Sequence, residues 1–173
     1  MAVLSVRLYG DPILRRIAPR VREITPEIRK IIADMTETMW HQVGIGLAAP
    51  QVGVSRRIIV MDDGHGGAQA LINPLITDQS GSVKEEEGCL SIPGVFAEVE
   101  RAKWVRVMAL DEDGQEINFE AQALRARVIQ HEIDHLDGVL FIDRLPPVTR
   151  DRIKKKIQKE GLAKEASHHA FAL

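Results

Sequence analysis

The chain has 173 residues, of which 45% are hydrophobic, 28% charged and only 4% aromatic, so it can bury an aliphatic core of its own as one domain. Its formal net charge of -2 creates no overall field that would attract DNA or a membrane surface, and we expect neither as a partner. A single cysteine excludes a disulfide within the chain, and no signal peptide or membrane-spanning apolar stretch is visible, so we expect a cytoplasmic protein.

The first predicted element is a helix that begins at Thr25-Pro26, because threonine is a favoured N-cap and proline a favoured first helical residue. Apolar residues then recur at helical spacing from Ile28 up to Val43, which predicts one buried stripe. Gly44 is expected to end this helix.

Short strands rich in β-branched residues are expected in the middle of the chain, at 57–61, 70–76, 95–99, 105–110 and 116–119. The stretch Asp62–Gly67 is interpreted as a flexible turn between strands, and Asp113-Gly114 signals a hairpin between the last two. Three successive acidic residues, Glu85–Glu87, are interpreted as a solvated turn, with the alternative that Glu87 orients a group of the site.

A second helix is predicted from about Gln122 to Leu136, and a third, rich in lysine and arginine, from about Thr149 to Glu160 after the break at Pro146-Pro147. The predicted strands do not alternate with helices, so the order of the elements gives no sign of a parallel sheet. We therefore expect an α+β fold with antiparallel strands. The tail segment Ser167–Ala170 could bind metal weakly, but is expected to be disordered and without function.

The most informative motif lies on the second predicted helix, where His131 and His135 are four residues apart and so share one helix face. Two such histidines can bind one metal ion, and Glu132, directly after the first, can reach a water bound to that ion. The alternative is a solvated helix face with two unrelated histidines.

A catalytic tetrahedral metal site needs a third protein ligand and one open position. Cys89 is the candidate, because it is the only cysteine and Gly88 and Gly94 lie close by in its segment, so that the backbone can approach a bound group. The alternative is that Cys89 is a small buried apolar residue.

A third segment, Gly44–Gly53, is rich in small residues and lacks the lysine and hydroxyl residue of a phosphate-binding loop. Small residues here would let an extended peptide lie along the backbone. Gln51 would add an amide donor for a developing oxyanion.

Taken together, these segments resemble the peptide deformylase family. That family carries a Gly-x-Gly-x-Ala-Ala-x-Gln loop, a Glu-Gly-Cys-x-Ser segment and a His-Glu-x-x-His helix in this order, and all three are present here. The stretches Gly10–Arg15, Gln130–Gly138 and Leu140–Asp143 also look like the family, so the resemblance spans roughly residues 10–145. It implies a deformylase-like α+β fold around a central metal-binding helix. Residues 1–147 would form the catalytic domain, and 148–173 a basic helix and tail of the same domain.

The resemblance also implies roles for individual residues. Cys89, His131 and His135 would be the metal ligands, and Glu132 the general base and later proton donor. Gln51 and the Leu90 N–H would stabilise the oxyanion while a metal-activated water removes the formyl group of an N-terminal methionine as formate. Substrate backbone would pair along Gly44, Ile45, Gly46 and Gly88.

The family further implies one divalent metal ion, Fe²⁺ in many members and Zn²⁺ in others, with Ni²⁺ or Co²⁺ as substitutes. N-formyl-methionyl nascent peptides would be the partners, and in some members the last helix docks on the ribosome. Where some relatives carry an arginine soon after the Cys-x-Ser segment, this chain has Phe96 or its neighbours, a departure that concerns the outer substrate contacts and not the chemistry.

Three rival interpretations stay open at this point. A metalloprotease would use the same helix motif, but would more often take a third histidine or a glutamate as ligand. A metal-stabilised module that binds peptide N-termini would not need Glu132 or Gln51, and both are present. An organellar deformylase, trimmed of a transit peptide, would look the same as a bacterial one.

Overall fold

The computed structural model describes residues 1–163 and Leu173, so the expectation for Ser167–Ala170 lies outside the described residues. The elements follow the order η1 (Pro12–Arg15), α1 (Pro26–His41), β1 (Gly46–Ala48), η2 (Ala49–Val52), β2 (Ile58–Met61), β3 (Gln69–Ser80), β4 (Val83–Cys89), β5 (Ile92–Arg101), β6 (Trp104–Leu110), β7 (Glu116–Gln122), α2 (Ala123–Leu136), η3 (Phe141–Arg144) and α3 (Pro147–Glu160). The α+β class with antiparallel strands is confirmed.

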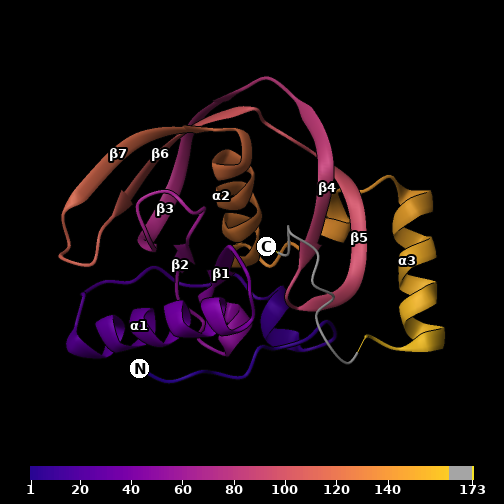
Figure 1. Ribbon diagram of the computed structural model, residues 1–173, viewed down its shortest axis with the longest axis horizontal. Helices are drawn as coiled ribbons and strands as arrows, with labels where there is room; N and C mark the ends of the chain where they lie inside the picture. Colours follow the sequence, from indigo (N-terminus) through magenta and orange to yellow (C-terminus); the bar gives the residue numbers. More distant parts are fainter. Residues whose placement is uncertain (164–172) are drawn as a thin grey trace.

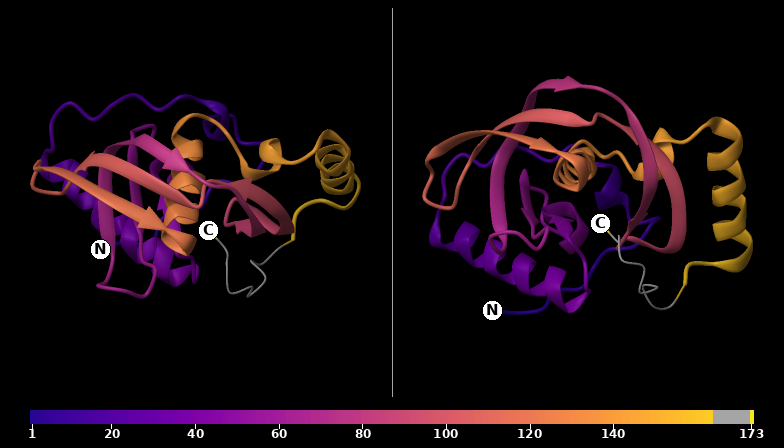
Figure 2. Two further views of the ribbon diagram at one scale, coloured as in Figure 1. Left: turned by 90° about the horizontal axis from the view of Figure 1, so that it is seen from above. Right: turned by 45° about the horizontal axis from the view of Figure 1, so that its top comes forward.

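Two antiparallel sheets make up the β structure of the described residues. The larger has the order β1-β2-β3-β6-β7, and β4 pairs with β5 in a separate two-stranded sheet. Strand β1 is therefore at an edge of the larger sheet, with one side bonded to β2 through the register Leu47 to Val60. The views agree that α2 is central and that α3 lies at the outer edge of the molecule, beyond β4 and β5 (Figures 1 and 2).

Helices α1 and α2 cover opposite faces of the larger sheet. On β2, Ile58 and Val60 belong to the buried cluster that contains the apolar stripe of α1, while Ile59 and Met61 belong to the cluster of α2. Successive side chains of a strand point to opposite faces, so both faces of this strand are buried. The sheet is therefore packed on both faces at this strand, and one face lies against α2, the helix that carries the histidine motif.

Helix α1 begins as predicted, with the Thr25 side chain accepting a hydrogen bond from the Ile28 N–H. It ends at His41, earlier than the apolar pattern indicated. Val43 is 67% exposed and adopts a left-handed backbone conformation with φ 57°, so the expected stripe does not extend to it. The Gly44 N–H then bonds to the Met39 carbonyl and closes the turn.

Most predicted strands are confirmed within a few residues, but β1 and β4 are additional. The interpretation of Glu85–Glu87 as a solvated turn is wrong, because these residues lie in β4 and Glu87 is fully buried. Helix α2 matches the prediction, and α3 begins at Pro147, two residues before the expected start.

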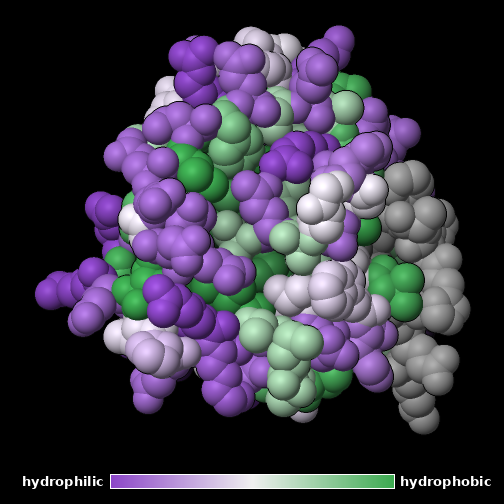
Figure 3. Space-filling model, turned by 60° about the vertical axis from the view of Figure 1, so that its left-hand side comes forward, coloured by the Kyte–Doolittle hydropathy of each residue, from purple (hydrophilic) through white to green (hydrophobic). Residues whose placement is uncertain are grey.

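The surface that comes forward in Figure 3 is mostly hydrophilic, and hydrophobic residues reach it only in scattered patches. No helix within residues 1–163 combines the length and the apolar character that crossing a membrane requires.

Candidate metal centre

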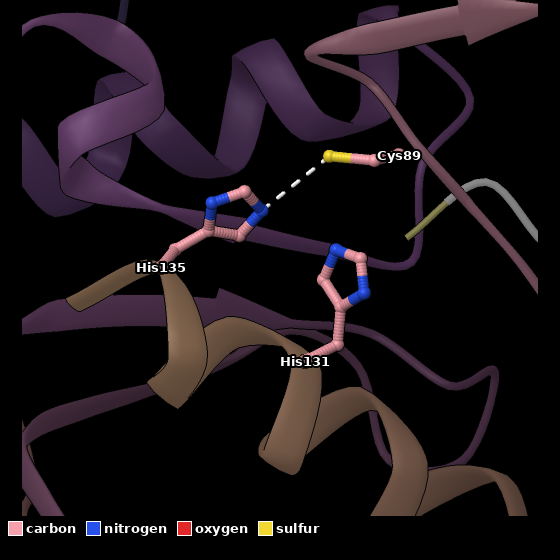
Figure 4. Close-up of side chains that lie close together, drawn as sticks. All are labelled: Cys89, His131 and His135. Atoms are coloured by element: carbon pink, nitrogen blue, oxygen red, sulfur yellow. Dashed lines mark hydrogen bonds between the residues drawn. The ribbon is translucent and has the colours of Figure 1, made fainter. Parts of the chain in front are cut away.

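Helix α2 places His131 and His135 one turn apart, both 1% exposed, and Cys89 faces them from the end of β4 (Figure 4). Cys89 Sγ lies 3.4 Å from His135 Nε2. One ligand atom from each of the three side chains lies within 4.8 Å of the others. Three soft or borderline donors at such separations, all buried, match the protein part of a tetrahedral metal site.

The orientation of His131 is fixed by Glu87. His131 Nδ1 lies 2.8 Å from Glu87 Oε1, and Glu87 is held in turn by Arg101, whose Nε and Nη2 donate to its two oxygens over 2.8 and 2.9 Å. Burial by itself would raise the pKa of Glu87, but the hydrogen bonds from Arg101 and His131 outweigh it and hold the pKa well below its ordinary value. Glu87 is thus an acceptor only, His131 donates from Nδ1, and its Nε2 keeps a lone pair for a ligand.

Arg101 is also bonded to α2 itself, because its Nη1 donates to Asp134 Oδ2 over 2.6 Å. Asp134 accepts further hydrogen bonds from Arg144. A second arginine, Arg127, pairs with Glu87 and donates to the Val99 carbonyl. This charge network ties β4, β5 and α2 together behind His131.

Glu132 points into the same space but has no partner for either carboxylate oxygen within the described part of the chain. It is fully buried, and its Oε1 lies 3.8 Å from His131 Nε2, which also lacks a hydrogen-bond partner among these residues. Burial, reinforced by the charge of Glu87, raises the pKa of Glu132 well above its ordinary value. Leaving such groups unpaired is costly, so their arrangement indicates an occupant of this space.

The three proposed ligands have the chemistry that a divalent cation needs. Burial, with Glu132 as second cause, raises the pKa of the Cys89 thiol to about 12, and a coordinated cation would convert the thiol to the thiolate. Burial, with His131 as second cause, lowers the pKa of His135 well below its ordinary value, which favours the neutral imidazole that binds metals. The residues present therefore fit a metal ion.

Gln51 and Leu90 reach the centre from two other segments. The Gln51 side-chain oxygen accepts the Ala48 N–H over 2.9 Å, and its Nε2 lies 3.6 Å from Cys89 Sγ and 3.1 Å from Ser91 Oγ. These contacts fix the amide with its donor end toward the centre. The Leu90 N–H, next to Cys89, bonds to the carbonyl oxygen of Leu173 over 3.1 Å.

The residues predicted to bind peptide backbone lie on both sides of the centre. Gly44 and Ile45 lead into the edge strand β1, which begins at Gly46, and Gly88 lies in β4 beside Cys89. The sequence did not predict which way a side chain at position 46 would point. A Cβ on Gly46 would lie 2.8 Å from Val128 Cγ1 and 3.1 Å from Glu132 Oε1. The missing side chain at this position leaves room for α2 and Glu132.

Sequence reasoning did not find Arg101, Asp134 or Ser91 as parts of the centre. Arg101 and Asp134 belong to elements that are far apart in sequence, so no local spacing connects them. Ser91 was visible in the Cys-x-Ser segment, and its contact with Gln51 gives that segment a structural reason.

A buried Cys-His-His set with an unpartnered carboxylate beside it, on an α+β frame, places the protein among metal-dependent hydrolases. The family model of polypeptide deformylases matches residues 3–151. Peptide deformylases of Alkalilimnicola ehrlichii and Carboxydothermus hydrogenoformans are similar to this chain. The first is 49% identical over 92% of this chain and 91% of its own, and the second is 52% identical over 87% and 98%.

Solved structures agree with the sequence relatives. The peptide deformylase from Thermus thermophilus superposes with a TM-score of 0.87 at 45% identity, over 91% of this chain and 95% of its own. That from Synechococcus elongatus, in complex with actinonin, superposes with a TM-score of 0.86 at 43% identity, over 93% and 89%. The chain belongs to the peptide deformylase family, metal-dependent enzymes that remove the N-formyl group from nascent peptides.

Proposed function

We propose that this chain hydrolyses the N-formyl group of N-terminal methionine through a metal-activated water, with Cys89, His131 and His135 as ligands and Glu132 as general base. The observation that carries this proposal is the buried Glu132 carboxylate, which lies beside the Cys-His-His set and has no partner for either oxygen among the described residues. A group held for structural reasons would be paired.

The side chains divide the chemistry between them. A divalent metal ion in this site would supply a water of lowered pKa and an electrophilic centre for the formyl oxygen. Glu132 takes the proton of the attacking water as the new C–O bond forms on the formyl carbon. Gln51 Nε2 and the Leu90 N–H donate to the formyl oxygen as negative charge develops on it. Glu132 then gives its proton to the leaving nitrogen, the C–N bond breaks, and formate and a free amine are released.

The substrate backbone has two candidate partners, the edge strand β1 with Gly44 and Ile45 before it, and Gly88 in β4. Backbone pairing of this kind gives affinity with little dependence on side chains. Selection should therefore fall on the first residue, and methionine should be strongly preferred over aspartate. Phe96, which lies against Gly88, would contact the residues beyond the first.

The ligand atoms narrow the choice of metal ion. A thiolate with two imidazoles suits Fe²⁺, Co²⁺, Ni²⁺ or Zn²⁺ better than Mg²⁺ or Ca²⁺. We propose Fe²⁺ as the native ion, on the precedent of the family. Activity would then decay in air and persist after replacement by Ni²⁺ or Co²⁺. A cytoplasmic location stays a prediction.

Formate release tests the proposal. The protein would be purified without oxygen, its metal quantified, and formyl-Met-Ala-Ser compared with acetyl-Met-Ala-Ser. We expect formate from the first and little acetate from the second, because a tight pocket excludes the larger acyl group. Cleavage of the internal peptide bonds would instead support the metalloprotease. Absence of formate with a full metal site would support the module that only binds N-termini.

We also propose that helix α3 binds the ribosome. It exposes basic side chains at Arg152, Lys154, Lys155, Lys156 and Lys159, its Arg150 is partly exposed, and none of its residues is buried. Phosphate contacts would make such binding fall steeply with salt. Glutamine at these five positions should abolish co-sedimentation with ribosomes and leave formate release unchanged. Equal co-sedimentation by the wild type and this variant would show that α3 is only a solvated surface.

A further inference from the structure

Leu173 lies beside the metal centre, although it is far in sequence from every residue around it. Its N–H donates to the Gly88 carbonyl over 3.2 Å, and its carbonyl accepts from the Leu90 N–H over 3.1 Å. The side chain is 1% exposed. The two hydrogen bonds flank Cys89, so the backbone of Leu173 is paired with the end of β4 at the centre itself.

These hydrogen bonds use the groups that a peptide would need. Strand β5 is paired with Glu87 and Cys89 of β4. The Gly88 carbonyl in β4 and the N–H of Leu90, the residue that follows β4, are bonded to Leu173 instead. Strand β1 is the edge of the larger sheet. A peptide bound between the β1 edge and Gly88 would therefore meet the same Gly88 and Leu90 groups that Leu173 uses. The carbonyl of Leu173 holds the same Leu90 N–H that we assign to the formyl oxygen.

The side chain of Leu173 also lies where an apolar first residue would be bound. It belongs to the buried cluster that includes Val128 and Ile129 of α2, against which Ile45 and Ile133 pack. Leucine and methionine are close in volume and polarity, and they replace one another in cores with little strain. A pocket that accepts Leu173 is thus of the right kind for methionine.

We propose that Leu173 is an intramolecular competitor of the substrate, which occupies the place of the first peptide residue and must leave before a formyl-peptide binds; this rests on the proposed function. A tethered group acts at an effective concentration on the order of millimolar, so even weak intrinsic affinity gives substantial occupancy. The apparent affinity for substrate falls by the fraction of the enzyme that is open. KM is therefore raised, while kcat, measured at saturation, is not.

The test is the full chain with Leu173→Asp, which places a charge in the apolar pocket, and with Leu173→Gly, which removes the side chain with less risk to the fold. Val148→Asp is the matched control, because Val148 is an apolar residue of α3 that is already 71% exposed. We expect both Leu173 variants to lower KM for formyl-Met-Ala-Ser at least about threefold at unchanged kcat. The Val148→Asp control should have the KM and kcat of the wild type.

Two further measurements make the outcome independent of turnover. The Leu90 amide should exchange with solvent faster in the Leu173 variants than in the wild type. A synthetic peptide of residues 168–173 should raise KM of the Leu173→Gly variant, and the same peptide with Asp in the last position should not. Equal KM and equal Leu90 exchange in wild type and variants would overturn the proposal. If no protein releases formate, the proposed function fails, and Leu90 exchange alone decides whether Leu173 occupies the site.

Discussion

His131 Nδ1 donates a hydrogen bond to Glu87 over 2.8 Å, and Glu87 is buried between Arg101 and Arg127. This relationship decides which nitrogen of His131 can bind a metal, and it links that choice to charges on β4, β5 and α2. The first prediction follows from it. Glu87→Gln should lower metal affinity roughly 10- to 100-fold, as the loss of such outer partners does in other metal sites.

The same variant should also destabilise the fold, because Arg101 and Arg127 would be left buried with less compensating charge. Breaking a buried pair by removing one partner costs about 3–5 kcal/mol. Glu98→Gln is the control, since Glu98 is an exposed acidic residue on the neighbouring strand β5. Metal titration and urea unfolding of both variants check the prediction, and equal results for the two would show that Glu87 has no special role.

A second prediction concerns the stability of the fold at acidic pH. The pKa of Glu87 is lower in the folded protein than its ordinary value of 4.5, so the folded state binds fewer protons than the unfolded state as the pH falls. The stabilisation is thus complete above about pH 4.5 and is lost as the pH falls towards the lower folded pKa. Metal-free wild type should lose unfolding free energy between about pH 5 and 3 more steeply than metal-free Glu87→Gln. Parallel curves of unfolding free energy against pH for the two proteins would contradict this prediction.

The third prediction separates two roles for Gly46. The sequence favoured a role in the approach of the peptide, in which case a larger residue would raise KM. The structure adds that a Cβ at this position would press on Glu132 and Val128. Gly46→Ala should therefore reduce kcat more than it changes KM. In a Glu132→Gln background the added loss should be small, because residues in contact are not additive. A rise in KM at normal kcat would show that Gly46 acts mainly in the approach of the peptide.

The fourth prediction concerns the third ligand. Cys89→Ser should lose most bound metal and its activity, while Gln51 and the two histidines remain in place. Chelation of the wild type should give an inactive protein that regains activity with Ni²⁺ or Co²⁺. Stoichiometric metal in Cys89→Ser would show that Cys89 is not required as a ligand. Full activity after complete chelation would remove the metal from the mechanism.

The parts of this molecule that could be predicted are those encoded by local spacing. His131 and His135 share a helix face because they are four residues apart, and the N-cap and proline of α1 are local signals. Strand β1 was missed because its three residues follow a glycine-rich segment without alternation. Strand β4 was missed because successive glutamates have low strand propensity, although Glu87 points inward and is buried.

Long-range pairings could not be predicted in the same way. Arg101 meets Glu87 across two strands and Asp134 across 33 residues of chain, and no periodicity connects them. The position of Leu173 against Gly88 and Leu90 is a relationship of the folded chain alone. Both depend on how β4 and β5 lie against α2, which the order of the elements does not specify.

The central claim is that Glu132 moves the protons of a metal-dependent deformylation. The most direct measurement is formate release from formyl-Met-Ala-Ser by wild type and Glu132→Gln at equal, quantified metal content. The amide keeps the size of the side chain but cannot act as a base, so kcat should fall by roughly a hundred- to ten-thousand-fold while KM changes little. Near-normal turnover by Glu132→Gln with a full metal site would show that another group carries the protons.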